Sequence, residues 1–188
     1  MDLVEFYFGL LGLLLALAAA QLASGFANAV QARRRRPVDV LTLVFALFVL
    51  LDLSIVWRWA WANRTFVSLT GLTIEATLLV ALLYYFAARL VFPRPHEKRA
   101  RSDAHYWANK RFVAGALILA NFVMFAFDTV HYGFPPASAP LAWLGLVTFY
   151  LPLVALLFTR GKIIDLVLLA IAIAHFLIST AYRISAGG

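Results

Sequence analysis

Residues 38–60 read VDVLTLVFALFVLLDLSIVWRWA, and Asp39, Asp52 and Arg58 are their charged positions. About 20 predominantly apolar residues allow an α-helix to cross the hydrocarbon of a bilayer. This stretch therefore predicts a transmembrane helix. Other segments of the 188-residue chain have the same character. The complete set of predicted spans is 3–30, 38–60, 66–92, 111–133, 140–159 and 163–183.

The composition agrees with this prediction. Hydrophobic residues make up 64% of the chain and charged residues 13%, whereas soluble domains have roughly 45–50% and about 25%. A chain of this length cannot hide so much apolar surface in one core, so the class of water-soluble globules is excluded. We expect an all-α integral membrane protein, a six-transmembrane-helix bundle forming one domain over residues 1–188. The long loop 93–110 is compatible with a three-plus-three arrangement, because many transporters consist of repeated halves.

The distribution of Lys and Arg predicts the orientation. Thirteen of the sixteen lie beside the one–two, three–four and five–six connections, Lys110 among them; the other three are Arg58, Arg64 and Arg183. Basic residues favour the cytoplasmic side. We therefore expect these connections, including loop 93–110, in the cytoplasm and both termini in the periplasm, in a bacterial inner membrane. Anionic lipid headgroups are the expected partners of the basic loops, and nucleic acid is not.

Two features predict how the helices pack. Gly12, Ala16, Ala20 and Ser24 recur every four residues in the first span, and small residues allow close helix contact in membranes. We expect this stripe to be the buried face of that helix, with an interface in a homo-oligomer as the alternative. Asp165 follows Lys162 by three residues, which predicts a structural ion pair within the last span.

Ionisable side chains inside a span are costly and are functional candidates by default. Asp52, Glu75, Asp128 and His175 all fall in the outer half of their predicted spans. If they line a water-filled cavity, burial disfavours the charged form of the carboxyls, and a histidine can relay protons. The working hypothesis is therefore a small transport or channel protein, linked to protons, with these four residues and Arg58 as relay candidates.

Two alternatives stay open. Arg58, Arg64 and Arg183 could instead pair with the acids in an inert network, as expected of a structural or accessory subunit of a larger membrane complex. The second alternative is a membrane redox protein, because Asp128 and His131 share a helical face and His175 could complete a site for a divalent metal or haem b. This signal is weak, and no cofactor is expected. Nor is an enzyme favoured, because the sequence has no catalytic motif that we recognise and no cysteine.

Trp57, Trp59 and Trp61 surround Arg58 near the predicted outer boundary. Such rings could form a cation–π box at the mouth of a ligand site. On a helix, however, Trp57 and Trp61 point about 40° apart and Trp59 points elsewhere. Anchoring at the membrane interface is therefore the favoured interpretation.

Overall fold

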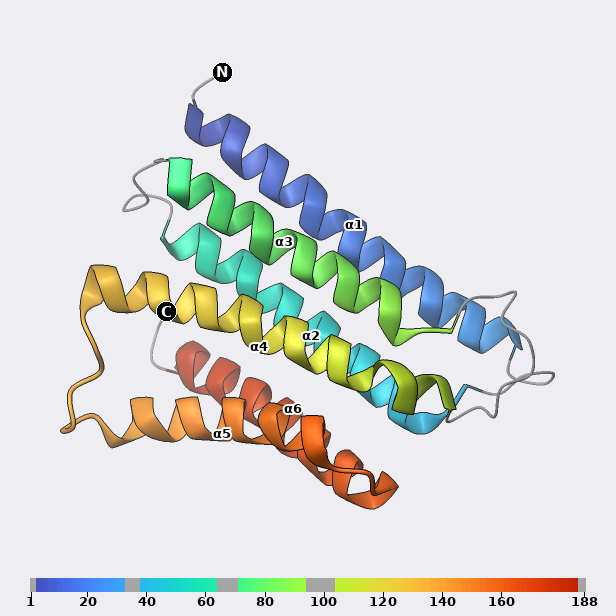
Figure 1. The fold of residues 1–188 in the computed structure, drawn as a ribbon. Coiled ribbons are helices and arrows are strands. Elements are labelled where there is room, and N and C mark those ends of the chain that lie inside the picture. The colour runs from blue at the N-terminus through green and yellow to red at the C-terminus, as the bar shows by residue number, and fades with distance from the viewer. Residues whose placement is uncertain (1–2, 33–37, 64–70, 94–103, 186–188) are drawn as a thin grey trace.

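The computed structural model describes residues 3–32, 38–63, 71–93 and 104–185, and these form six α-helices without a strand (Figure 1). All six are long and apolar enough to cross a membrane. The prediction of an all-helical, multi-pass membrane protein is confirmed at this level. The helices are α1 (Leu3–Ala32), α2 (Val40–Ala62), α3 (Gly71–Val91), α4 (Ala104–Tyr132), α5 (Pro140–Phe158) and α6 (Lys162–Ser185).

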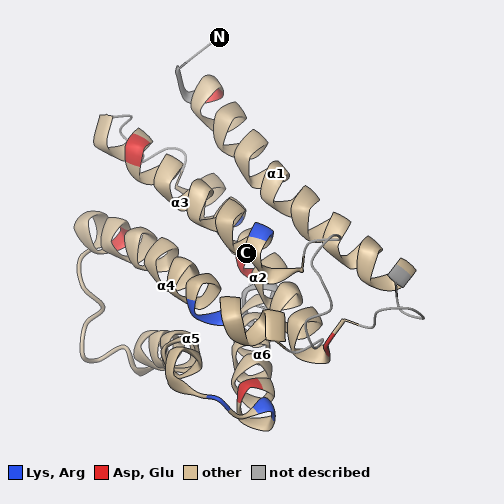
Figure 2. Cartoon of the chain, turned by 45° about the vertical axis from the view of Figure 1, so that its right-hand side comes forward, with Lys and Arg blue, Asp and Glu red and all other residues tan. Residues whose placement is uncertain are grey.

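Consecutive helices run in opposite directions, so the bundle has two distinct ends (Figure 1). We call the end with Leu3, Tyr132 and Ser185 the terminal end. The opposite end, with Arg89 and Lys162, is called the basic end. Charged residues are sparse along the described helices, as expected for elements that face lipid (Figure 2).

Helix α2 is the centre of the bundle, because it contacts α1, α3, α4 and α6. Helices α5 and α6 form a hairpin that packs against α4 and α2, and α1 contacts only α2 and α3 among the described helices. The packing is therefore a four-helix group with an added hairpin, and it does not confirm a three-plus-three arrangement.

The predicted buried stripe of α1 is wrong, because Ala16, Ala20 and Ser24 are exposed. The close approach occurs instead at Gly25, where an added Cβ would overlap the ring of Phe92 after α3. Because the Phe92 ring fits against Gly25, a neighbouring face of α1 points into the bundle. That face carries three leucines, Leu11, Leu15 and Leu22, together with Ala18.

Helix α4 begins at Ala104, ahead of the predicted span 111–133. The stretch 103–111, where Tyr106 and Trp107 stand among charged residues, was expected to form an interfacial helix leading into that span, and its described part is helical. Tyr106 and Lys110 are buried on this first part of α4. Lys110 was predicted as one of the basic residues of a solvated loop. Its burial instead makes it part of the bundle interior.

Candidate functional site

Asp52 lies near the middle of α2, and none of its surface is exposed. Its Oδ2 accepts a hydrogen bond of 2.7 Å from the hydroxyl of Tyr84 on α3. The same oxygen accepts a bond of 2.9 Å from Nδ2 of Asn121 on α4. Nδ2 of Asn121 also donates to the Tyr84 hydroxyl oxygen at 3.1 Å. We call these three residues the Asp52 cluster; it joins α2, α3 and α4 in the middle of the bundle.

The second carboxyl oxygen of Asp52, Oδ1, is buried and has no hydrogen-bond partner within the described part of the chain. On the side towards the basic end, the next turn of α2 carries Phe48, which is fully buried. The Phe48 ring lies 6.5 Å from that of Phe149 on α5 and 5.4 Å from that of Phe176 on α6. These three rings form an aromatic layer between α2 and the α5–α6 hairpin, one turn of α2 from Asp52 towards the basic end.

The other predicted relay residues do not gather around Asp52. Asp128 accepts a hydrogen bond of 2.8 Å from the indole nitrogen of Trp59. Glu75 is exposed on the second turn of α3. His175 Nδ1 lies 2.8 Å from the hydroxyl of Thr148 on α5. Each therefore has different surroundings, and the structure does not bring the acids and the imidazole together in one site.

Arg58 forms no ion pair with Asp52, Glu75 or Asp128 in the described ranges. Its Nε is buried and has no hydrogen-bond partner among the described atoms. Arg64 and the side chain of Arg183 lie outside the described residues. The geometry therefore does not support the inert arginine network for Arg58.

The three tryptophans beside Arg58 face different helices. Trp57 is 42% exposed and lies over Gly12 of α1, where an added Cβ would be 3.2 Å from its ring. Trp59 faces α4 through Asp128. The Trp61 ring lies 6.5 Å from that of Phe8 on α1 and is 56% exposed. The three rings do not enclose one common space.

The predicted metal ligands are also apart. Asp128 and His131 lie near the end of α4. The exposed His131 ring stacks on that of Phe127, with 4.1 Å between the ring centroids. His175 lies on α6 beside Thr148. Among the described residues, no group of three His, Asp or Glu side chains is arranged to hold a metal ion.

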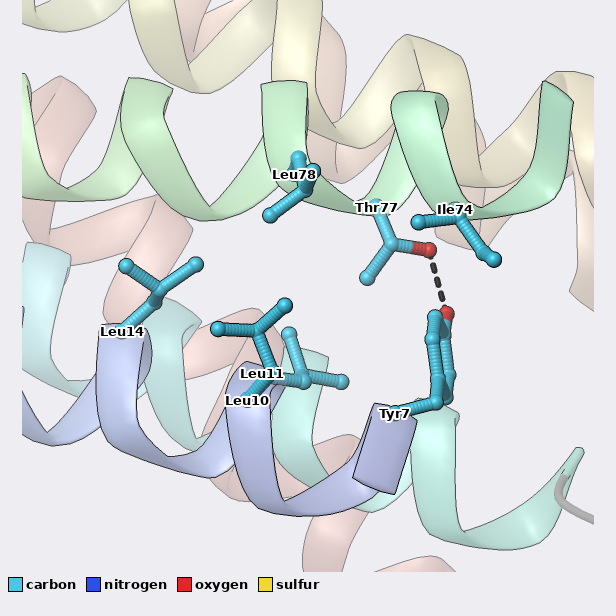
Figure 3. Close-up of a pocket in the computed structure, with 7 residues that line it drawn as sticks. All are labelled: Tyr7, Leu10, Leu11, Leu14, Ile74, Thr77 and Leu78. Atoms are coloured by element: carbon cyan, nitrogen blue, oxygen red, sulfur yellow. Dashed lines mark hydrogen bonds between the residues drawn. The ribbon is translucent and has the colours of Figure 1, made fainter. Parts of the chain in front are cut away.

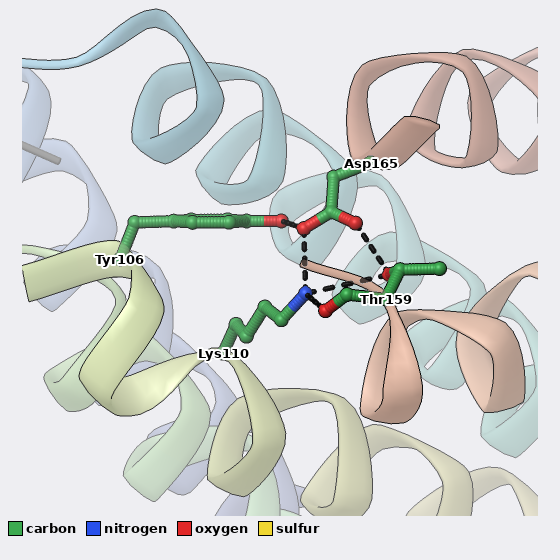
Figure 4. A network of polar contacts seen from close by, with 4 residues as sticks. All are labelled: Tyr106, Lys110, Thr159 and Asp165. Carbon is green, nitrogen blue, oxygen red and sulfur yellow. Dashed lines mark hydrogen bonds and ion pairs between the residues drawn. The ribbon is translucent and has the colours of Figure 1, made fainter. Parts of the chain in front are cut away.

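A second buried polar group lies at the basic end; we call it the Lys110–Asp165 cluster (Figure 4). Lys110 is 3% exposed, Asp165 is completely buried, and Nζ to Oδ2 is 2.7 Å. The hydroxyl of Tyr106 donates to the same Oδ2 at 2.9 Å, and the hydroxyl of Thr159 donates to Oδ1. Lys110 Nζ also donates to the Thr159 carbonyl. The cluster thus ties α4 to both helices of the hairpin near their connection.

The predicted pairing of Asp165 with Lys162 is wrong. Asp165 is buried against α4 and pairs with Lys110, whereas the exposed Lys162 reaches Asp39 just before α2, with 2.5 Å between Nζ and Oδ1. A fully buried carboxylate requires a partner that is also removed from water. Lys110 meets this requirement and Lys162 does not.

A small hollow lies between α1 and α3 (Figure 3). Its volume is about 10 Å³, close to the minimum for one water molecule. The hydroxyls of Tyr7 and Thr77 hydrogen-bond at its edge. Its lining is otherwise aliphatic: Leu10, Leu11, Leu14, Ile74 and Leu78. The hollow is too small and too apolar for a polar solute.

No protein-family model, curated protein or solved structure matches this chain significantly. The candidate sites therefore depend on the residues of this chain alone. The depth of Asp52 in its span was predicted from the sequence, whereas Tyr84 and Asn121 were not predicted as its partners. Their depth was the available signal, because both are polar residues far from the ends of their helices. Lys110 was missed because its position beside a basic loop explained its charge sufficiently.

Proposed function

We propose that this chain is a proton-linked membrane transporter in which Asp52 is the proton-binding group. The observation that carries the proposal is the asymmetry of the buried carboxyl. Oδ2 accepts two hydrogen bonds, from Tyr84 and Asn121, while Oδ1 has no partner in the described structure. A proton added to Oδ1 leaves both bonds to Oδ2 in place. The cluster can therefore hold the carboxyl in either protonation state with little rearrangement.

The position of the cluster suits this role. Asp52 is ten residues before the end of α2, so it lies roughly 15 Å from either membrane surface. Ionisable groups at such depth are typical of proton pathways. Asp52 is the one carboxyl that we propose to bind the proton, since Glu75 is exposed and Asp128 accepts a hydrogen bond from Trp59. By the excess of basic residues, we place the basic end in the cytoplasm of a bacterial inner membrane, against anionic headgroups.

The test is proton flux into proteoliposomes, driven by a pH gradient and reported by an entrapped pH-sensitive dye. We expect flux with the native protein and its loss in Asp52→Asn, which keeps the shape of the side chain. Asp128→Asn is the matched control, because it neutralises a half-buried acid on α4 outside the cluster; its flux should equal that of the native protein. Native flux in Asp52→Asn would refute the proposal.

A second candidate function is a structural or accessory subunit of a membrane complex. The observation that favours it is the Lys110–Asp165 cluster, in which a buried ion pair is satisfied by the hydroxyl of Tyr106 on α4 and by the hydroxyl and carbonyl of Thr159 directly after α5. Such a cluster fixes the register of helices without requiring transport. A folded native protein that conducts no protons in the same vesicles would favour this candidate.

A further inference from the structure

We propose that the α5–α6 hairpin is a movable gate, hinged at the terminal end and held closed at the basic end by the ion pair between Lys110 and Asp165. The hairpin is linked covalently to α4 through residues 133–139 at the terminal end. At the basic end, side chains alone connect it to α4 and α2. That the gate opens a route to Asp52 rests on the proposed function. The latch, which is the ion pair at the basic end, and the hinge at the terminal end do not rest on it.

The latch is formed by contacts between α4 and the α5–α6 connection. Lys110 reaches across to the Thr159 carbonyl at the end of α5 and to Asp165 on α6. Tyr106, one turn before Lys110, donates to the same carboxylate. A second contact, from Lys162 to Asp39, joins α6 to the start of α2. These polar contacts connect the free end of the hairpin to both helices against which it packs.

The polar contacts at the basic end determine whether the gate stays closed, because in a bilayer the apolar contacts of a helix can be exchanged for contacts with lipid. Lipid tails are as apolar as leucine, so they can replace the aromatic contacts of a displaced hairpin. Lipid cannot replace the partners of Lys110 and Asp165, both of which are buried. Separation of these groups in the membrane is costly unless water enters at the basic end.

The hinge lies at Gly133, directly after α4. Its φ of +80° is in the left-handed region, and an added Cβ would meet nothing within 4 Å. Glycine adopts this conformation without steric cost. Pro135 and Pro136 follow and limit where the chain can bend, since proline fixes φ. Within the connection 133–139, Gly133 is therefore the residue whose φ can change with the least steric cost.

Opening of the gate would remove the aromatic layer that lies one turn of α2 from Asp52, between the cluster and the basic end. Phe48 is one turn from Asp52 and packs on Phe149 of α5 and Phe176 of α6. Both partners belong to the hairpin, whereas Tyr84 and Asn121 belong to helices that stay in place. Movement of the hairpin would thus remove the aromatic layer and leave the hydrogen bonds of Asp52 intact.

Cysteine accessibility tests the gate directly, because the native chain contains no cysteine. Ala172→Cys is the reporter; Ala172 is fully buried on α6 between the latch and the aromatic layer. Ala18→Cys is the comparison reporter, equally buried on α1, which does not contact the hairpin helices. The measurement is the rate of modification by a charged, membrane-impermeant thiol reagent that is present both inside and outside the proteoliposomes.

Breaking the latch with Lys110→Met should increase the modification rate at Ala172→Cys by roughly 150- to 4,000-fold, the factor that corresponds to the cost of removing one partner of a buried ion pair. The rate at Ala18→Cys should not change. Arg111→Met is the matched control, because it removes the adjacent, exposed charge of α4. It should leave both rates at their native values.

The exchanged pair Lys110→Asp with Asp165→Lys should lower the rate at Ala172→Cys again by restoring the attraction. An equal increase at both reporters would mean general loosening and would overturn the gate. An unchanged rate at Ala172→Cys in Lys110→Met would overturn the latch. Thiol modification requires no transport, so the gate can fail while Asp52-dependent flux persists, and the reverse outcome is equally distinguishable.

Discussion

Replacement of Tyr84 by Phe tests whether the Asp52 cluster holds α2, α3 and α4 together. The change removes one hydroxyl and with it the 2.7 Å bond to Oδ2 of Asp52 and the 3.1 Å contact from Asn121. An unsatisfied buried group costs about 1–3 kcal/mol, whereas hydrogen bonds between membrane helices contribute about 0.6 kcal/mol on average and up to about 1.7. Because Asp52 and Tyr84 are both fully buried, water cannot replace the donor. We expect a loss of about 1–2 kcal/mol in the free energy of unfolding.

The assay is reversible unfolding in mixed micelles, followed by circular dichroism. Tyr85→Phe is the matched control; it removes the hydroxyl of the next, half-buried residue of α3, whose ring lies against Phe86. A double-mutant cycle with Asn121→Leu should give a coupling of at least about 0.5 kcal/mol, as found for residues in one network. If Tyr84→Phe and Tyr85→Phe are equally stable and the coupling is zero, the cluster does not bind the helices together.

Two further predictions concern the bundle. Gly25→Ala should destabilise the protein by about 1–3 kcal/mol in the same assay, because its Cβ would overlap the Phe92 ring. Gly9→Ala, where an added Cβ meets nothing within 4 Å, should instead stabilise the helix by about 0.5–1 kcal/mol; equal effects of the two would contradict the packing. Lys110→Met should cost about 3–5 kcal/mol, while the apolar pair Lys110→Met with Asp165→Leu should be close to neutral. A double variant as unstable as the single one would show that an uncompensated charge is not the cause.

The number and approximate position of the helices could be predicted from the sequence, because each span corresponds to one continuous run of mostly apolar residues. The described part of the chain contains six helices long and apolar enough to span a membrane. The depth of Asp52 followed from its position in residues 38–60. These properties depend only on distance along one helix, which sequence specifies directly.

The rotation of each helix and the pairing between helices could not be predicted in the same way. The small residues Ala16 and Ala20 were expected to be buried, but the notch required by Phe92 is at Gly25. Asp165 was assigned to Lys162 because they are close in sequence, yet burial selects Lys110, 55 residues earlier. Both errors have one cause: contacts across the bundle depend on which faces meet, and periodicity within one helix does not determine this.

The long sequence separation within the Asp52 cluster has a consequence for biogenesis. Asp52 is synthesised 32 residues before Tyr84 and 69 residues before Asn121. At about 5–20 residues per second, the ribosome reaches Asn121 some 3 to 14 s after Asp52. During this interval α2 enters the membrane with a solitary acid, which costs roughly 2.5–3.5 kcal/mol at the centre of an inserting segment. Helix α2 also has the highest hydropathy of the six spans, so its surplus of leucine, valine and phenylalanine lets the translocon accept the acid before its partners exist.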